Sequence, residues 1–307
     1  MTQKTVRRVR HRRRHGVGYF ISLIVLTALC ALILLPIVFT FLYSFFPKGE
    51  ITSFLNQRGN YDVTVWMDVP LSPAVFSLRQ YYKILIEEPS YLKLFCNSAM
   101  YTAAILVGQG LVIPLTAYAL SRFEFRGKNA LMVLIMMLMV LPFQVTMAPS
   151  VITLRTLGLM DTPWAVILPM IFSPFYIFLL RQFMVGLPNG LLEAGMIDGS
   201  SHLGIFFRLM LPNAVPMMVT IILFAFSWQW TDNYYSQLFL GHSDYTVITN
   251  ALIGLRAYGV NIESFTNVFR NAIIDTGIVL SVLPLVIVYI FGQKFFVQGV
   301  SQSGIVG

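Results

Sequence analysis

Charged residues are scarce in this chain of 307 residues, because Asp, Glu, Lys and Arg together make up only 11% of it. Soluble globular domains carry about 25% charged residues. Hydrophobic residues make up 57%, and the mean hydropathy is +0.73. Such a composition excludes a soluble globular protein and predicts a chain that lies in a lipid bilayer.

Residues that bind metals or act as nucleophiles are also few. The four histidines all fall in predicted loops or in the amino-terminal tail, so no buried cluster can hold a metal. Cys30 and Cys96 lie in or beside apolar segments and are interpreted as small apolar residues. There is no GxSxG motif, and Gly127-Lys128 lacks the upstream glycine of a phosphate-binding loop. The sequence therefore predicts neither an enzyme nor an ATPase, and no cofactor in this chain.

Long apolar runs are abundant instead. A helix needs about 20 apolar residues to cross the ~30 Å hydrocarbon core of a bilayer. Six segments approach this length: Tyr19–Phe45, Phe95–Leu120, Ala130–Met147, Trp164–Phe183, Ala214–Trp230 and Ile273–Phe291. We therefore predict an all-α membrane protein with six transmembrane helices, in which residues 46–94 form a loop.

Basic residues predict the orientation, because Lys and Arg are favoured on the cytoplasmic side of a membrane. They are concentrated before Gly16 and recur between the second and third spans. We predict a cytoplasmic tail over residues 1–16, a membrane domain over 17–297 and a cytoplasmic carboxyl-terminal tail over 298–307. The Arg-rich run at 7–15 is interpreted as a topology signal, with binding to anionic lipid or nucleic acid as the alternative.

A polar segment, LLEAGMIDGSSHLGIFFRLMLP at 191–212, separates the fourth and fifth spans. Pro188 suits a first helical turn, and Asp198-Gly199 predicts a tight turn. Ser200 or Ser201 can then cap a second helix, which we expect to stop at Pro212. The prediction is two short helices that project from the membrane and share an apolar face of Leu191, Leu192, Ile197 and Phe206. A helix pair lying on lipid headgroups fits the same pattern.

The spacing of Glu193-Ala194, Asp198-Gly199, Arg208 and Pro212 resembles the EAA loop of permease subunits of binding-protein-dependent ABC importers. Further likeness covers most of the chain. It includes AYALSRFEFRGK at 117–128, LGLMDTPWAVILP at 157–169, FLLRQF at 178–183 and QKFFVQG at 293–299. These stretches are similar to the sugar-importing branch, which includes the smaller permease subunit of the maltose transporter.

The resemblance implies a type I (MetI-like) permease fold in the inner membrane of a bacterium or archaeon, with both termini cytoplasmic. It also implies that residues 186–212 dock on a separate ATP-binding subunit, which alone binds ATP and Mg²⁺. The residues implied for coupling are Glu193, Ala194, Gly195, Asp198, Gly199, Arg208 and Pro212. Small residues at Ala194 and Gly195 would let this partner approach. Gly190 departs from the family pattern, since an acidic residue is common there.

The implied partners are a second homologous permease, two ATP-binding subunits and an extracellular solute-binding protein, with no nucleic acid. Aromatic rings stack on sugars, and several lie near the outer end of the fifth span beside polar residues. We therefore assign a carbohydrate pathway to Trp228, Gln229, Trp230, Asp232 and Tyr234. An aromatic belt at the membrane interface is the alternative interpretation.

The leading hypothesis is a permease subunit of an ATP-driven importer of an oligosaccharide or related carbohydrate. One alternative is an ABC permease for another polar solute. Another is a secondary carrier or channel that works without an ATPase, although the spans contain no deep charge pair and no evident internal repeat. A third is a membrane scaffold with a docking loop and no transport activity.

Overall fold

The computed structural model describes residues 17–50, 71–87, 89–241, 245–253 and 267–303, which form helices and no strand. The first half contains α1 (Val17–Tyr43), α3 (Arg79–Tyr82), the π-helical η1 (Lys83–Glu87), α4 (Pro89–Arg122), α5 (Lys128–Val140), α6 (Phe143–Thr156) and α7 (Pro163–Ile171). The second half contains α8 (Pro174–Val185), α9 (Gly190–Ile197), α10 (His202–Ile205), the π-helical η2 (Phe206–Met210), α11 (Leu211–Thr231), α12 (Tyr234–Phe239), α13 (Ile248–Ile253) and α14 (Asn267–Ser303).

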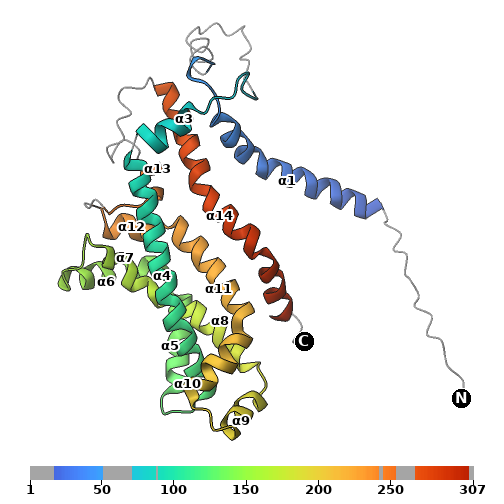
Figure 1. Ribbon diagram of the computed structural model, residues 1–307, viewed down its shortest axis with the longest axis vertical. Helices are drawn as coiled ribbons and strands as arrows, with labels where there is room; N and C mark the ends of the chain where they lie inside the picture. The colour runs from blue at the N-terminus through green and yellow to red at the C-terminus, as the bar shows by residue number, and fades with distance from the viewer. Residues whose placement is uncertain (1–16, 51–70, 88, 242–244, 254–266, 304–307) are drawn as a thin grey trace, which may run out of the picture.

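Helix α4 runs along the length of this elongated molecule, and several other helices pack on it (Figure 1). It has 34 residues, so at 1.5 Å per residue it is about 50 Å long. It packs against α7, α8 and α11. The main core cluster lies on its second half, where Ile113, Ala117 and Leu120 meet Ile177 and Leu180 of α8. The prediction that residues 46–94 form a loop is wrong at its end, because α4 already begins at Pro89.

Five helical segments of the described chain are long and apolar enough to cross a membrane. They are residues 18–43, 90–122, 163–185, 202–231 and 272–294. Three of the six predicted spans, Tyr19–Phe45, Phe95–Leu120 and Ile273–Phe291, are thus confirmed within about five residues at each end, and Trp164–Phe183 is confirmed as the α7–α8 pair. Ala214–Trp230 lies inside a longer segment.

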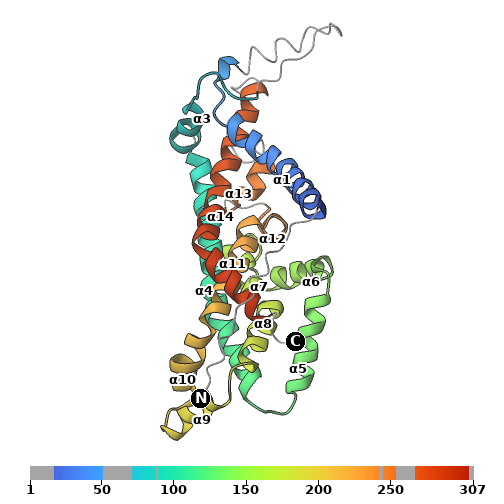
Figure 2. The ribbon, with the colours of Figure 1, turned by 90° about the vertical axis from the view of Figure 1, so that its right-hand side faces the viewer.

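The third predicted span, Ala130–Met147, is not one straight helix. Helix α5 ends at Val140, and α6 leaves it at an angle of 105°. Proline disfavours the helical conformation in the residue before it, and Leu141 takes an extended conformation ahead of Pro142. With 13 residues, α5 is only about 20 Å long. Figure 2 shows α5 standing beside the rest of the molecule, with α6 turned back toward α7 and α12.

The fourth span is broken between α7 and α8 by Pro174, whose nitrogen carries no hydrogen. The carbonyl of Met170, four residues earlier, therefore loses its helical donor. The buried side chain of Gln109 on α4 supplies the missing donor, with Nε2 2.7 Å from Met170 O. Ser173 caps the new helix by accepting from the Tyr176 amide. A polar side chain of α4 thus supplies the hydrogen bond that the neighbouring α7–α8 span loses at Pro174.

The fifth span is longer than predicted and has a different start. Helices α10, η2 and α11 follow one another without a break from His202 to Thr231. The expectation that the second loop helix stops at Pro212 is therefore wrong. Pro212 lies in the first turn of α11, where its missing N–H is tolerated, directly after the wider π-helical turn. The Asn213 side chain donates to Leu209 O at 2.7 Å.

Helix α1 is set apart from the other helices and contacts α14 near its carboxyl-terminal end (Figure 1). Its most apolar window has no buried residue. At that junction the Thr276 hydroxyl of α14 donates to Ser44 O at 3.3 Å. Almost the whole length of α1 is thus an apolar surface available to lipid or to another chain.

Candidate functional site: the loop between α8 and α11

Residues 186–212 form the end of the molecule farthest from α3 and α13 (Figures 1 and 2). The first arm is α9, which ends at a tight turn with Gly199 at φ +75°. The Ser200 amide donates to Gly195 O at 3.0 Å, and the Gly199 amide donates to Met196 O at 3.0 Å. This pair of bonds is a Schellman motif, in which glycine is favoured because its φ is positive. The turn predicted at Asp198-Gly199 is confirmed.

The second arm begins at Ser201, whose side chain accepts from the Gly204 amide at 3.2 Å. Of the two serines that were candidates, Ser201 is therefore the cap of α10. From there the chain runs through α10 and η2 into α11. The second arm and the fifth membrane span are one continuous helical segment.

The two arms pack directly on each other at Gly195. A Cβ atom added there would lie 2.8 Å from Ile205 Cγ1 and 3.0 Å from Leu209 Cδ1. The small size of Gly195 thus serves contact between the arms of the loop itself. Ala194, in contrast, is exposed, and so is Pro212.

The tip of the loop exposes large apolar side chains. The exposed fraction is 85% for Ile197, 63% for Leu203 and 58% for Phe207. The predicted apolar face is wrong in one respect, because Phe206 is buried in the core while Ile197 points outward. We call Met196, Ile197, Leu203 and Phe207 the apolar tip.

Three charged side chains lie on the same loop as the apolar tip. Glu193, Asp198 and Arg208 are exposed, and none of their side chains has a hydrogen bond or ion pair within the described part of the chain. An exposed apolar patch rimmed by charges is typical of a protein interaction site. Except for Gly195, the residues predicted for coupling are therefore placed on the surface of the loop.

The base of the loop is held by Arg122, which the sequence reasoning missed as a site residue. It is the last residue of α4, and its guanidinium donates to Asn189 Oδ1. The other terminal nitrogen donates to Met184 O at 2.7 Å and to Leu187 O at 2.8 Å. No pattern within 186–212 could reveal this partner, because it lies more than 60 residues earlier in the chain.

The second arm is held by the same end of α4. The Tyr118 hydroxyl donates to His202 O at 3.4 Å, and the rings of Tyr118 and Phe206 lie 5.2 Å apart. The Phe123 ring lies 4.8 Å from the imidazole of His202. Both arms of the loop are thus attached to one helix end.

The residues predicted for a substrate pathway lie around the other end of α11 and have unequal exposure. Trp228 and Tyr234 are 60% and 59% exposed, whereas Trp230 is buried and donates from Nε1 to Ser281 O at 2.8 Å. Asp232, two residues before α12, accepts from the Ser236 amide in the first turn of that helix at 3.1 Å. Burial raises the pKa of Asp232, and hydrogen bonds from Ser236 and Tyr235 partly offset that rise. Gln229 is half-buried and, with Trp230 and Asp232, lines a small hollow.

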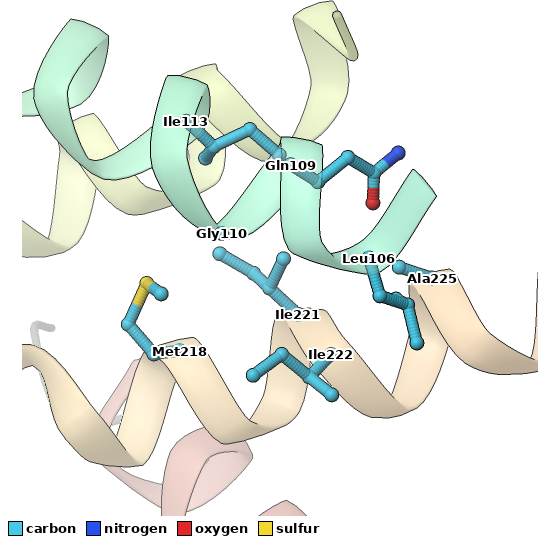
Figure 3. Close-up of a pocket in the computed structure, with 8 residues that line it drawn as sticks. All are labelled: Leu106, Gln109, Gly110, Ile113, Met218, Ile221, Ile222 and Ala225. Carbon is cyan, nitrogen blue, oxygen red and sulfur yellow. The ribbon is translucent and has the colours of Figure 1, made fainter. Parts of the chain in front are cut away.

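A second hollow lies between α4 and α11 (Figure 3). Its lining comes from Leu106, Gln109, Gly110 and Ile113 of α4 and from Met218, Ile221, Ile222 and Ala225 of α11. Its lining is apolar apart from Gln109, whose Oε1 is buried without a hydrogen-bond partner. The hollow offers no set of polar groups that could orient a solute.

The fold and the loop together define a class of protein: a multi-pass helical membrane protein with exposed apolar side chains on a loop at one end. Comparison with known proteins identifies the family. The model of the binding-protein-dependent transport system inner membrane component matches residues 110–302, and the chain belongs to this family. It is therefore a membrane component of a transport system rather than an enzyme.

Individual relatives of this chain are permease proteins of transport systems, which agrees with the family. The arabinooligosaccharides transport system permease protein AraQ of Halalkalibacterium halodurans is 30% identical over 273 residues, which cover 89% of this chain and 91% of AraQ. The sn-glycerol-3-phosphate transport system permease protein UgpE of Pectobacterium atrosepticum is 29% identical over 209 residues, which cover 67% of this chain and 72% of UgpE. A chain of a bacterial ABC transporter involved in alginate import has the same fold, with a TM-score of 0.77 at 22% identity and coverage of 92% and 98%.

Proposed function

We propose that this chain is one permease subunit of an ATP-driven importer for an oligosaccharide or a related carbohydrate. It works with a second homologous permease, two ATP-binding subunits and an extracellular solute-binding protein. Residues 186–212, the coupling loop, dock on an ATP-binding subunit. Both termini face the cytoplasm, as does the coupling loop.

The observation that carries this proposal is the apolar tip, with the exposed side chains of Glu193, Asp198 and Arg208 on the same loop, at one end of a multi-pass fold. Ile197 and Leu203 are too exposed to stabilise the chain on its own. Both gain free energy when a partner covers them, since burying a large aliphatic side chain is worth about 1.5–3 kcal/mol. Charges at the rim then select the partner and its orientation.

The carbohydrate substrate is supported by the arabinooligosaccharide relative and by the alginate importer. Trp228, Gln229 and Tyr234 are the residues we assign to contact with the solute, while Trp230 and Asp232 hold the helices that carry them. The glycerol-3-phosphate relative supports a second candidate, a permease for another polar solute. Calorimetry on the solute-binding protein encoded beside this chain, with a panel of sugars and glycerol-3-phosphate, distinguishes the two.

The test of coupling is Glu193→Lys in the reconstituted transporter. A charge reversed at the rim should uncouple transport, so that solute-stimulated ATP hydrolysis and uptake both fall while membrane insertion is retained. Arg126→Glu is the control for charge reversal, because Arg126 is an exposed charge in the turn after α4 and its side chain has no hydrogen bond or ion pair in the described structure. Unchanged uptake in Glu193→Lys would contradict docking, and solute uptake by the chain alone would favour a secondary carrier.

A further inference from the structure

The end of α4 attaches to the coupling loop through hydrogen bonds to neutral acceptors. Arg122 donates to two backbone carbonyls, Met184 O and Leu187 O, and to the side-chain carbonyl of Asn189. Met184 lies in the last turn of α8, where its carbonyl accepts from the Leu187 amide, three residues later, at 3.2 Å, and the helix end carries partial negative charge. A cation placed there satisfies these carbonyls and stabilises the end of α8.

These bonds require arginine in particular. The acceptors are shared between two terminal nitrogens of a planar guanidinium, whose N–H groups point in fixed directions. Lysine offers a single nitrogen, which cannot reproduce this fork. A substitution that keeps the charge therefore still breaks the attachment.

Helix α4 also has polar attachments at its other end. Asn97 Nδ2 donates to Thr246 O at 2.9 Å, and the Tyr101 hydroxyl donates to Tyr245 O at 2.9 Å. The Ser98 hydroxyl accepts from the Ile248 amide at 2.9 Å. These acceptors and donors belong to the connection between α12 and α14. One helix thus joins the coupling loop to the opposite end of the molecule (Figure 1).

We propose that Arg122 is a positioning residue for coupling, which fastens the first arm of the coupling loop to α4 so that the two move as one body. This inference rests on the proposed function. Movement imposed on the loop by the ATPase then reaches α4 and, through α4, the connection that contains Tyr245 and Thr246. Without the hydrogen bonds of Arg122, the loop moves but α4 does not move with it, and ATP is hydrolysed without transport.

The experiment uses the complete transporter, with all its subunits, in proteoliposomes. Four variants are compared with the wild type: Arg122→Lys, Asn189→Ala, Asn189→Asp and Arg126→Lys. Arg126 is the matched control, because it is an exposed arginine in the turn after α4 and has no hydrogen bond in the described structure. Solute transported per ATP hydrolysed is measured, together with hydrogen exchange of the amides in residues 189–199.

In Arg122→Lys, solute transported per ATP should fall about tenfold, within the range of energetic effects seen for residues that link two sites. The amides of residues 189–199 should exchange faster. Asn189→Ala should show a smaller loss, and Asn189→Asp should show none, since a carboxylate still accepts from Arg122. Arg126→Lys should match the wild type in both measurements.

Wild-type transport per ATP in Arg122→Lys would overturn the proposal, and so would unchanged hydrogen exchange. If Arg122→Lys fails to assemble, the variants Asn189→Ala and Asn189→Asp test the proposal instead. Equal transport per ATP in Asn189→Ala and the wild type would then overturn the proposal. Absence of ATP-driven uptake in the wild-type complex refutes the proposed function instead. Hydrogen exchange in Arg122→Lys would still report whether the loop is fastened to α4.

Discussion

Two glycines shape the coupling loop at the residue scale, each for a different physical reason. Gly195 is needed because its neighbours leave no space for a Cβ atom, whereas Gly199 is needed because its φ is +75°. Gly190 has neither constraint, since nothing lies within 4 Å of the Cβ it lacks. The three positions therefore respond differently to the same substitution.

Gly195→Ala should separate the two arms of the loop, because the new Cβ would lie 2.8 Å from Ile205 Cγ1. We expect the amides of α9 to lose protection from hydrogen exchange. Gly190→Ala is the control and should raise α9 stability by up to about 1 kcal/mol, since alanine is the better helix former. Equal protection in the two variants would contradict the close packing at Gly195.

Gly199→Ala places a side chain in the left-handed region at a cost of roughly 1–2 kcal/mol. There is space for the methyl group, so this strain is the whole expected effect. Proteolysis at the turn should become about tenfold faster, as expected when cleavage follows the population of the opened loop. Gly199→Asn should be milder, because asparagine tolerates this conformation. A rate for Gly199→Ala equal to that of the wild type would refute the argument.

Local chemistry made some of these residues predictable. The Asp198-Gly199 turn and a serine cap follow from backbone preferences of the residues themselves. Arg122 and the packing of Gly195 could not be predicted, because both depend on which distant side chains the fold brings near. Glu193, Asp198 and Arg208 were predicted through family resemblance, and the structure shows them exposed.

At the scale of elements, a polar side chain of one helix can replace the backbone hydrogen bond that proline removes from a neighbouring helix. Gln109→Leu should remove the donor to Met170 O and leave this carbonyl unpaired beside Pro174. An unpaired buried acceptor costs about 1–3 kcal/mol, so the unfolding midpoint in a detergent titration should fall. Gln293→Leu, at an exposed site whose one hydrogen bond goes to Ile290 O three residues earlier, should have little effect. Equal midpoints for both variants would contradict the bridging role of Gln109.

The errors in element prediction have a common cause. Hydropathy identifies apolar runs but does not show whether a helix continues through them. Pro142 ends α5, whereas Pro212 sits inside the segment 202–231, which continues past it. The difference is that Pro142 follows an extended residue, while Pro212 follows a π-helical turn that accommodates it. This choice depends on tertiary packing and is not visible in a window of sequence.

At the scale of the whole molecule, the structure places the coupling loop and the α4–α5 turn at one end and α3 at the other (Figures 1 and 2). Together with the positive-inside rule, this arrangement predicts where reagents gain access. After Cys30 and Cys96 are replaced by alanine, cysteines at Phe125 and Ile197 should react with a membrane-impermeant maleimide from the cytoplasmic side only. A cysteine at Leu78 should react from the outer side only. Labelling of Ile197→Cys in intact cells would overturn the orientation.

The exposure of α1 predicts dependence on a partner permease. A helix with no buried residue in its most apolar window gains little from its own chain. We expect the chain expressed alone to be degraded faster in cells than the chain expressed with the second permease. Deleting the partner's gene and following the half-life of this chain measures the effect. An unchanged half-life would mean that contact with lipid alone is enough to keep α1, and with it the chain, stable in the membrane.

The unbroken helical segment from His202 to Thr231 also limits how this protein can change in evolution. Each residue added to an α-helix rotates everything beyond it by about 100°, because one turn takes 3.6 residues. A single insertion between 202 and 231 would turn the apolar tip away from its partner or turn Trp230 out of its contact with Ser281. Length changes should therefore be confined to the non-helical residues before α9 and between α9 and α10, and the number of residues from the tip to Trp230 should be fixed among functional homologues.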